Sequence, residues 1–326
     1  MIKALVMFSG GLDSRLVIKI LQEQKIDIIA LNFDLPFGSG CCKSSCSWKF
    51  TQLQGIPLRI VDCKKGKNFQ EFIKIVKSPK HGHGSGMNPC IDCRIFMLKK
   101  AKSLMKKLKA DFIATGEVLD ERPMSQHRKA MQIVEAESGL QGKLLRPLSA
   151  KLLPETDAEK KGLIDRNNLF GIQGRQRKQQ IELANKYNMD YPSPGGGCLL
   201  CEKEYVKKLE DLFKNNKNIL PEDIALLKIG RHFRFEENKI IVARNAEESQ
   251  MLREFKGVKF ELEKHIPGPT TLLIGKAGKE AIKKAAQLTL FHSKNKANVV
   301  YGERKFNKSI FPENLERKEV ENIRIQ

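Results

Sequence analysis

The stretch Ser9-Gly10-Gly11-Leu12-Asp13-Ser14 carries the residue types that bind phosphate groups. Its glycine pair allows a tight turn whose backbone N–H groups stay available for an anion. The hydroxyls of Ser9 and Ser14 add donors, and the carboxylate of Asp13 can hold a divalent metal ion beside phosphates. The lysine of a GxxxxGK[ST] loop is missing, which argues against an ordinary phosphate-transferring P-loop. A tight turn without any ligand is the alternative interpretation.

Cys90 and Cys93 form one CxxC pair, and Cys198 and Cys201 form a second pair far along the chain. Thiolates at this spacing are typical ligands of zinc or of an iron–sulfur cluster. A closed zinc site would use all four thiolates, whereas a cluster held by three would leave one iron open for chemistry. The third interpretation needs no metal: one cysteine carries a persulfide and another resolves it as a disulfide.

The chain has eight cysteines. Adjacent cysteines rarely chelate one metal, so we expect structural or incidental roles for the group that follows the second predicted strand, namely Cys41, Cys42 and Cys46. Cys63 ends a strand and is expected to be a small core residue. His81 and His83 lie in the glycine-rich segment 80–86, which predicts a mobile loop rather than a metal site.

Alternating strands and helices supply the scaffold for these residues. Apolar runs predict strands at residues 2–8, 26–33, 56–61 and 111–115. Helical patterns lie between them at residues 12–24, 44–53, 69–76 and 94–108. This rhythm is typical of an α/β fold with a doubly wound parallel sheet. Ligands bind beyond the carboxyl ends of such strands, which is where the SGGLDS loop lies.

The pattern changes beyond residue 144. Helices are expected at residues 155–163, 173–187, 202–215 and 279–293, with strands at 239–243 and 271–274. We predict three parts: a domain at 1–150 built on the parallel sheet, a helical extension at 151–218 carrying the second CxxC pair, and a smaller α+β domain at 226–326.

The composition and net charge of the 326-residue chain limit the kinds of partner that it can bind. Hydrophobic residues make up 40% and charged residues 30%, so a sizeable core is expected. No run of about 18 apolar residues exists, and the chain starts directly in a strand, which predicts a cytoplasmic protein without a membrane partner. The formal net charge of +21 favours a polyanionic partner, and nucleic acid fits better than a membrane surface.

Together these motifs resemble a known family. SGGLDS resembles the PP-loop of the ATP-pyrophosphatase superfamily, whose fold is HUP-like, and the segments Asn88-Pro89-Cys90-Ile91-Asp92-Cys93 and Thr115-Gly116 resemble its tRNA 2-thiouridylase (MnmA-like) branch. The resemblance covers residues 1 to about 210. Residues from about 226 resemble instead the RNA-binding domain of NFACT proteins, through Val242 to Glu248 and the stretch His265-Ile266-Pro267-Gly268-Pro269.

The resemblance implies an ATP-dependent tRNA sulfurtransferase that adenylates a uridine carbonyl oxygen and replaces it with sulfur. It implies tRNA and a sulfur donor (sulfide or a persulfide carrier) as partners, and ATP and Mg²⁺ as cofactors, with a [4Fe-4S] cluster or, alternatively, Zn²⁺. Cys93 and Cys198 match the two catalytic cysteines, and Asp13 is the third expected catalytic residue, holding Mg²⁺ at the departing pyrophosphate. The expected cofactor-binding residues are Ser9, Gly10, Gly11, Asp13, Ser14, Asn32, Phe33 and Gly116. The expected metal ligands are Cys90, Cys93, Cys198 and Cys201.

Two departures keep other functions open. Glu117 follows Thr115-Gly116 where the thiouridylases commonly have His-Tyr, and the β-barrels of that branch are not evident here. A PP-loop ligase of another kind, of the tRNA-lysidine or amidotransferase type, would keep the adenylation chemistry and would not need Cys93 or Cys198. A non-catalytic RNA-binding adaptor stapled by zinc would need no ATP turnover at all.

Overall fold

The computed structural model of the protein describes residues 1–38, 44–193, 197–264, 266–293, 295 and 297–325, and within 44–46 it describes the backbone alone. The chain divides into two compact units, Met1–Cys201 and Glu202–Gln326. Cys41 and Cys42 lie outside the described residues, as does the side chain of Cys46.

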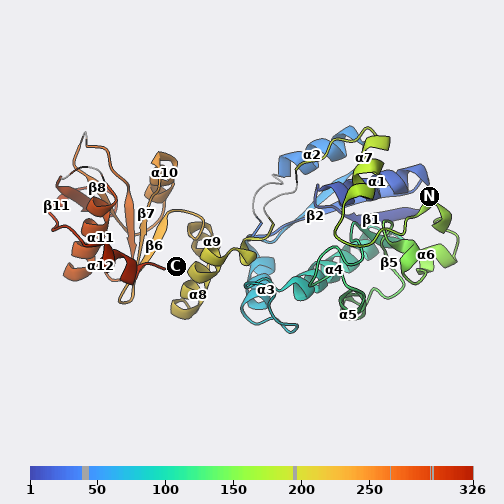
Figure 1. Ribbon diagram of the computed structural model, residues 1–326, viewed down its shortest axis with the longest axis horizontal. Helices are drawn as coiled ribbons and strands as arrows, with labels where there is room; N and C mark the ends of the chain where they lie inside the picture. Colours follow the sequence, from blue (N-terminus) through green and yellow to red (C-terminus); the bar gives the residue numbers. More distant parts are fainter. Residues whose placement is uncertain (39–43, 194–196, 265, 294, 296, 326) are drawn as a thin grey trace. The chain divides into compact units, whose positions relative to one another are not determined.

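The first unit is built on five parallel strands in the order β3-β2-β1-β4-β5, as expected for a doubly wound sheet (Figure 1). The strands are β1 (Lys3–Met7), β2 (Asp27–Asp34), β3 (Leu58–Asp62), β4 (Phe112–Thr115) and β5 (Leu144–Leu145). The helices are α1 (Leu12–Glu23), α2 (Ser44–Leu53), α3 (Gly66–Lys77), α4 (Cys90–Lys107), α5 (Arg128–Ser138), α6 (Asp157–Lys160) and α7 (Lys178–Lys186).

Side chains of the central strands alternate between the two faces of this sheet, because successive residues of a strand point to opposite sides. Ala4 and Val6 of β1 join the core formed with α1 and α7. Leu5 and Met7 join the core formed with α4 and α5. Both faces are therefore covered, and the carboxyl edge of the sheet is left for the loops that follow the strands.

Two predicted helices of the first unit are shorter than expected. The pattern at 173–187 becomes a helix only from Lys178, because Gln173 pairs with Leu119 in a β-bridge and Gly174 has a φ of +89°. The pattern at 155–163 becomes the one-turn helix α6, which starts with a capping box between Thr156 and Glu159.

The second unit contains a six-stranded antiparallel sheet in the order β11-β10-β8-β9-β7-β6. Its strands are β6 (Arg231–Phe235), β7 (Asn238–Val242), β8 (Val258–Leu262), β9 (Thr271–Ile274), β10 (Val299–Gly302) and β11 (Lys308–Ile310). Its helices are α8 (Lys203–Asn215), α9 (Pro221–Leu226), α10 (Ala246–Glu254), α11 (Lys279–Phe291) and α12 (Arg317–Ile323). Helices α11 and α12 pack on one face of this sheet, and α9 and α10 pack on the other.

The sequence-based division into three parts stays a prediction. In the structure α8 belongs to the second unit, where Asp211 on this helix pairs with Arg234 of β6 at 2.6 Å. The second CxxC pair ends the first unit.

Candidate active site

The SGGLDS turn connects β1 to α1 at the carboxyl edge of the parallel sheet. Gly10 has a φ of +83°, and a Cβ built on it would lie 2.6 Å from the Ser47 hydroxyl oxygen. Gly11 is the N-cap residue of α1 and supplies no side-chain cap. The uncapped start of α1 therefore presents backbone N–H groups of the kind that bind phosphate oxygens.

Gly116 follows β4 and packs directly against the start of α1. A Cβ at this position would lie 2.7 Å from the backbone nitrogen of Ser14 and 2.8 Å from the carbonyl carbon of Asp13. Real Cβ atoms do not approach backbone so closely, so only glycine lets β4 and the turn come together. The structure thus brings Gly116 next to the SGGLDS turn, and its role in nucleotide binding stays a prediction.

Asp13 is the charged centre of this edge. Its Oδ2 pairs with Arg177 at 3.2 Å, and Arg177 also lies 3.9 Å from a carboxylate oxygen of Glu121. Burial raises the pKa of Asp13, and the guanidinium groups of Arg177 and Arg122 oppose this shift. Burial and the neighbouring Asp13 also raise the pKa of Glu121. Two carboxyl groups and two guanidinium groups therefore meet beside the glycine turn.

Three buried polar atoms at this edge lack a hydrogen-bond partner among the described residues: Oδ1 of Asp13, Oγ of Ser47 and Nε of Arg177. Buried polar groups nearly always have partners, so such a concentration indicates a place where a ligand completes the hydrogen bonding. A carboxylate oxygen suits Mg²⁺, and a guanidinium group and backbone N–H groups suit phosphate. The residues present therefore fit the pyrophosphate of ATP together with Mg²⁺.

The other predicted nucleotide-binding residues support the turn from the side. The hydroxyls of Ser9 and Ser14 lie 3.3 Å apart, and that of Ser14 donates to the Gly11 carbonyl at 2.9 Å. Asn32 donates to the Phe8 carbonyl at 2.9 Å, which fixes the chain at the end of β1. Phe33 packs against the core on the α4 face.

A backbone hydrogen bond joins the two CxxC segments within the first unit. Met87, just before the first pair, donates its N–H to the carbonyl of Leu200 in the second pair at 2.9 Å. Cys198 forms a β-bridge with Gly38. Cys90 begins α4 and accepts a hydrogen bond at 3.1 Å from the side chain of Asn88.

Cys93 lies one turn into α4, and its environment disfavours the thiolate. Burial raises the pKa of the Cys93 thiol to about 12; Arg94 opposes this shift, and Cys198, Cys90 and Cys63 add to it. Cys198 is therefore close enough to Cys93 for their charges to interact, although the two positions are far apart in sequence. Cys201 is exposed.

The described cysteines do not assemble the donor set of a zinc or iron–sulfur site. Among them, no group of three or more His, Cys, Asp or Glu side chains is arranged to hold a metal ion. The four-cysteine site for a cluster or zinc therefore stays a prediction, and we derive no step through such a group. The Cys63 side chain is buried, as expected for a core residue.

The two histidines of segment 80–86 have protein partners instead of a metal. His81 Nε2 lies 3.0 Å from a carboxylate oxygen of Glu137, and His83 Nε2 lies 2.8 Å from the Val76 carbonyl oxygen. The segment has no regular secondary structure, as its glycines predict.

Glu117 follows Thr115-Gly116 where the thiouridylases commonly have His-Tyr. It connects α4, the helix that carries Cys90 and Cys93 and is called the cysteine helix below, to the sheet. Its buried carboxylate lies 2.9 Å from Nε of Arg146 and 3.4 Å from Nε of Arg94. Burial acts to raise the pKa of Glu117, but the guanidinium groups of Arg146 and Arg94 and a hydrogen bond from Thr115 hold it below its ordinary value. Arg94, the neighbour of Cys93, is thus fixed from the β4 side.

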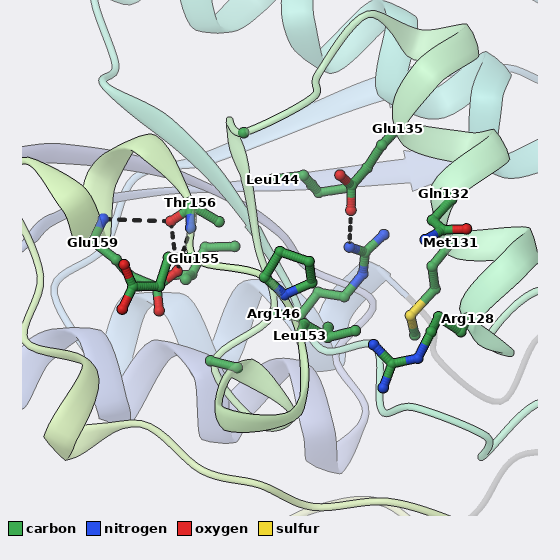
Figure 2. Close-up of a pocket in the computed structure, with 14 residues that line it drawn as sticks. Arg128, Met131, Gln132, Glu135, Leu144, Arg146, Leu153, Glu155, Thr156 and Glu159 are labelled. Carbon is green, nitrogen blue, oxygen red and sulfur yellow. Dashed lines mark hydrogen bonds and ion pairs between the residues drawn. The ribbon is translucent and has the colours of Figure 1, made fainter.

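Arg146 also lines a cavity of about 100 Å³ between α5, β5 and the start of α6. Figure 2 shows Arg146 paired with Glu135 on one side of this cavity, with Thr156 and Glu159 on the other. Nη2 of Arg146 has no partner among the described residues. The cavity is separate from the glycine turn in its lining residues, although Glu117 connects Arg146 to the cysteine helix.

Comparisons with known proteins match the two units to different families. Residues 2–156 match the tRNA methyl transferase HUP domain, and residues 230–322 match the NFACT protein RNA binding domain. The tRNA-specific 2-thiouridylase MnmA of Karelsulcia muelleri (strain GWSS) is 24% identical over 250 residues, which cover 73% of this chain and 60% of the relative. The 2-thiouridylase MnmA of Leptospira interrogans serovar Lai is 33% identical over 127 residues, covering 35% of this chain and 33% of the relative.

The chain thus spans 60% or less of the length of these curated relatives. A solved complex described as a 4-thiouridine synthetase with RNA and bound ATP aligns at 16% identity with a TM-score of 0.35, covering 69% of this chain and 51% of that chain.

No helix among the described residues is long and apolar enough to span a membrane.

Proposed function

We propose that this chain, which joins a HUP domain of the tRNA methyl transferase type to an NFACT-type RNA-binding domain, is an ATP-dependent tRNA sulfurtransferase. Its reaction adenylates a uridine carbonyl oxygen and replaces that oxygen with sulfur. One observation carries the proposal: the first compact unit contains both the glycine turn and the two cysteines Cys93 and Cys198. In the turn, one carboxylate oxygen of Asp13 is buried and has no hydrogen-bond partner among the described residues. Curated relatives named as tRNA-specific 2-thiouridylases support it. We propose the cytoplasm as its location.

The activation step belongs to the glycine turn. A uridine carbonyl oxygen is a poor leaving group, and transfer of AMP to it makes a good one. The N–H groups at the start of α1 and the Ser9 hydroxyl bind the departing pyrophosphate, and the Ser14 hydroxyl joins them by turning away from the Gly11 carbonyl. Asp13 would hold Mg²⁺, which supplies neutralisation of the charge that develops on the phosphates. Arg177 orients the Asp13 carboxylate through their 3.2 Å contact.

The substitution step belongs to the cysteines. A terminal persulfide sulfur on Cys198 attacks the activated carbon, and AMP leaves with the former carbonyl oxygen. The Cys93 thiolate then attacks Sγ of Cys198, so that the sulfur–sulfur bond breaks and the thiocarbonyl remains on the base. This leaves a Cys93–Cys198 disulfide, which an external thiol must reduce before the next cycle.

Arg94 has a defined role in this step. The raised pKa of Cys93 means that the thiol is protonated in the unliganded protein, and Arg94 is the neighbour that favours the thiolate. Glu117 holds the Arg94 side chain at 3.4 Å and so acts as a positioning residue. Attack by Cys93 therefore requires that its thiol first loses a proton, which Arg94 favours.

RNA binding is assigned to both units. Residues 1–201 carry a net charge of +14 and residues 202–326 a net charge of +7, so neither unit repels a polyanion. The RNA-binding family match at 230–322 supports docking of the tRNA on the second unit. The tRNA's phosphates would then give binding that weakens steeply with salt.

The test is pyrophosphate release and tRNA thiolation by the full chain, supplied with ATP, tRNA and a persulfide donor. We expect Asp13→Ala to abolish pyrophosphate release while the fold stays intact. The matched control is Asp27→Ala, at the amino end of β2, whose carboxylate pairs with Lys3 at 3.5 Å. Unchanged release by Asp13→Ala would contradict the assignment of the turn.

Cysteine variants separate thiolation from the other PP-loop reactions. We expect Cys93→Ser and Cys198→Ser to release pyrophosphate but to yield no thiolated tRNA, whereas a ligase of the lysidine or amidotransferase type would stay fully active. Iron and acid-labile sulfide should be measured on anaerobically purified protein. Iron and sulfide that disappear in Cys198→Ser would replace the persulfide step with sulfide held on a cluster.

A further inference from the structure

The second unit contains a cavity of about 240 Å³ whose lining is strongly basic. It lies between the first turns of α8, the start of β6 and the chain end after α12. Six cationic side chains line it: Lys203, Lys207, Lys208, Arg231, Arg244 and Arg324. Glu204 is the carboxylate among the lining residues. The cavity therefore has a large excess of positive charge.

Four of these cations have no carboxylate partner among the described residues. Arg244 pairs with Glu248 and Arg324 pairs with Glu321, but the other four form no ion pair within 4.0 Å in the described part of the chain. Within the described residues, Lys208 donates to the Gly230 carbonyl at 3.3 Å and Arg231 to the Ala243 carbonyl at 3.4 Å, and both acceptors are uncharged. Their charges are thus left for an external anion.

The pKa of the Lys208 ammonium group reflects the same excess of positive charge. Burial lowers the pKa of the Lys208 ammonium group, and the nearby guanidinium groups of Arg244 and Arg324 lower it further. Glu204 and Glu248 offset this only in part. An anion in the cavity would relieve this repulsion and raise the pKa of Lys208 again.

We propose that this cavity binds a phosphate group of the RNA. Charges converge on it from a helix, a strand and the chain end, which suits an oxyanion with several acceptor oxygens. A volume of about 240 Å³ is that of roughly eight waters at ~30 Å³ each, which leaves room for a phosphate and part of its nucleotide.

The segments that build the cavity lie partly outside the RNA-binding family match. That match spans residues 230–322, whereas Lys203, Lys207 and Lys208 precede it and Arg324 follows it. The phosphate site is thus added to the domain by its flanking segments. This inference rests on the proposed function in one respect, since it takes the anion to be part of an RNA.

The experiment compares two double variants of the full chain that remove equal charge. The first double variant, Lys203→Gln with Lys207→Gln, removes two exposed lysines that line the cavity and lie one helical turn apart. Lys214→Gln with Lys217→Gln removes two exposed lysines that do not line it, one at the far end of α8 and one just beyond. None of the four forms an ion pair among the described residues, so both variants should fold, which circular dichroism checks.

Binding of labelled tRNA is measured by fluorescence anisotropy at several salt concentrations. We expect the cavity variant to weaken binding by on the order of tenfold and to reduce the salt slope by about one, the value for one lost phosphate contact. The control should change affinity less than about twofold. Equal losses in the two variants would overturn the proposal, because they would reveal only a diffuse charge effect.

Two further arms identify the source of the phosphate. If tRNA with a 5′-hydroxyl binds the wild-type chain as weakly as 5′-phosphorylated tRNA binds the cavity variant, the site takes the terminal phosphate. If both tRNA forms bind the wild type equally and the cavity variant still loses affinity, the site takes an internal phosphodiester. A wild-type chain that binds tRNA but fails to thiolate it would refute the proposed function and leave this site standing.

Discussion

Glu117→Gln tests whether the buried ion pairs hold the cysteine helix in place. The Glu117 carboxylate is 2% exposed and lies 2.9 Å from Arg146 Nε and 3.4 Å from Arg94 Nε, and it accepts a hydrogen bond from Thr115 at 3.2 Å. Glutamine keeps the shape of the side chain but removes its charge. Arg146, itself 3% exposed, then keeps Glu135 as its one carboxylate partner among the described residues.

The size of the effect follows from burial. Removing one partner of a buried ion pair costs about 3–5 kcal/mol. Arg146 retains a second carboxylate, and Arg94 is 31% exposed, so the loss should lie at the lower end, about 3 kcal/mol. For a unit of this size that corresponds to a fall in Tm of roughly 6–12 °C.

Differential scanning calorimetry of the full chain measures the transition of the first unit. Glu135→Gln is the matched control, because Glu135 pairs with the same Arg146 but is 25% exposed. We expect the control to lose about 1 kcal/mol, or roughly 2–4 °C. Equal shifts for the two variants, or no shift for Glu117→Gln, would refute the reasoning that burial sets the strength of this network.

The pH dependence gives an independent check. The pKa of Glu117 is lower in the folded protein than its ordinary value of 4.5, so its stabilisation is present above about pH 4.5 and is lost as the pH falls through the folded pKa. The difference in Tm between wild type and Glu117→Gln should therefore shrink in acid. A difference that stays constant from pH 7 to pH 3 would contradict the assigned charge.

Two further results are expected. Gly116→Ala should abolish pyrophosphate release without unfolding the second unit, because its Cβ would lie 2.7 Å from the Ser14 nitrogen and push the glycine turn away from β4; release at the wild-type rate would show that the turn tolerates the shift. Iodoacetamide should modify Cys93 far more slowly than exposed Cys201, because with a pKa of about 12 only ~1 thiol in 10⁴ is ionised at pH 8. The Cys93 rate, followed by peptide mass spectrometry, should rise about tenfold per pH unit; a plateau below pH 9 would contradict the raised pKa.

Most of the parallel sheet could be predicted from the sequence, and β5 with helix α5 could not. The apolar runs that predict β1 to β4 are long enough to show a strand pattern. Strand β5 has only two residues, Leu144 and Leu145, and no periodicity exists in so short a segment. Helix α5 was missed because its first turn is polar and its start depends on the side chain of His127 as a cap.

The sequence by itself determined the glycine turn, since a strand, two glycines and a helix are adjacent in the chain and each has its own local signal. It also determined the fold class, because the order of strands and helices limits the sheet to a few arrangements. Only the tertiary structure decided which charges surround Asp13. Arg177 and Asp13 are 164 residues apart along the chain, and no local sequence pattern predicts a contact between them.

The same holds for the cysteines. Sequence spacing predicts two pairs, but the approach of Cys198 to Cys93 depends on how the segment before α8 returns to Gly38. Glu117 contacts Arg94 and Arg146 only because folding buries its carboxylate between these two guanidinium groups. Motifs made of neighbouring residues can be recognised in the sequence. Burial and the long-range pairing of charges exist only once the core has formed.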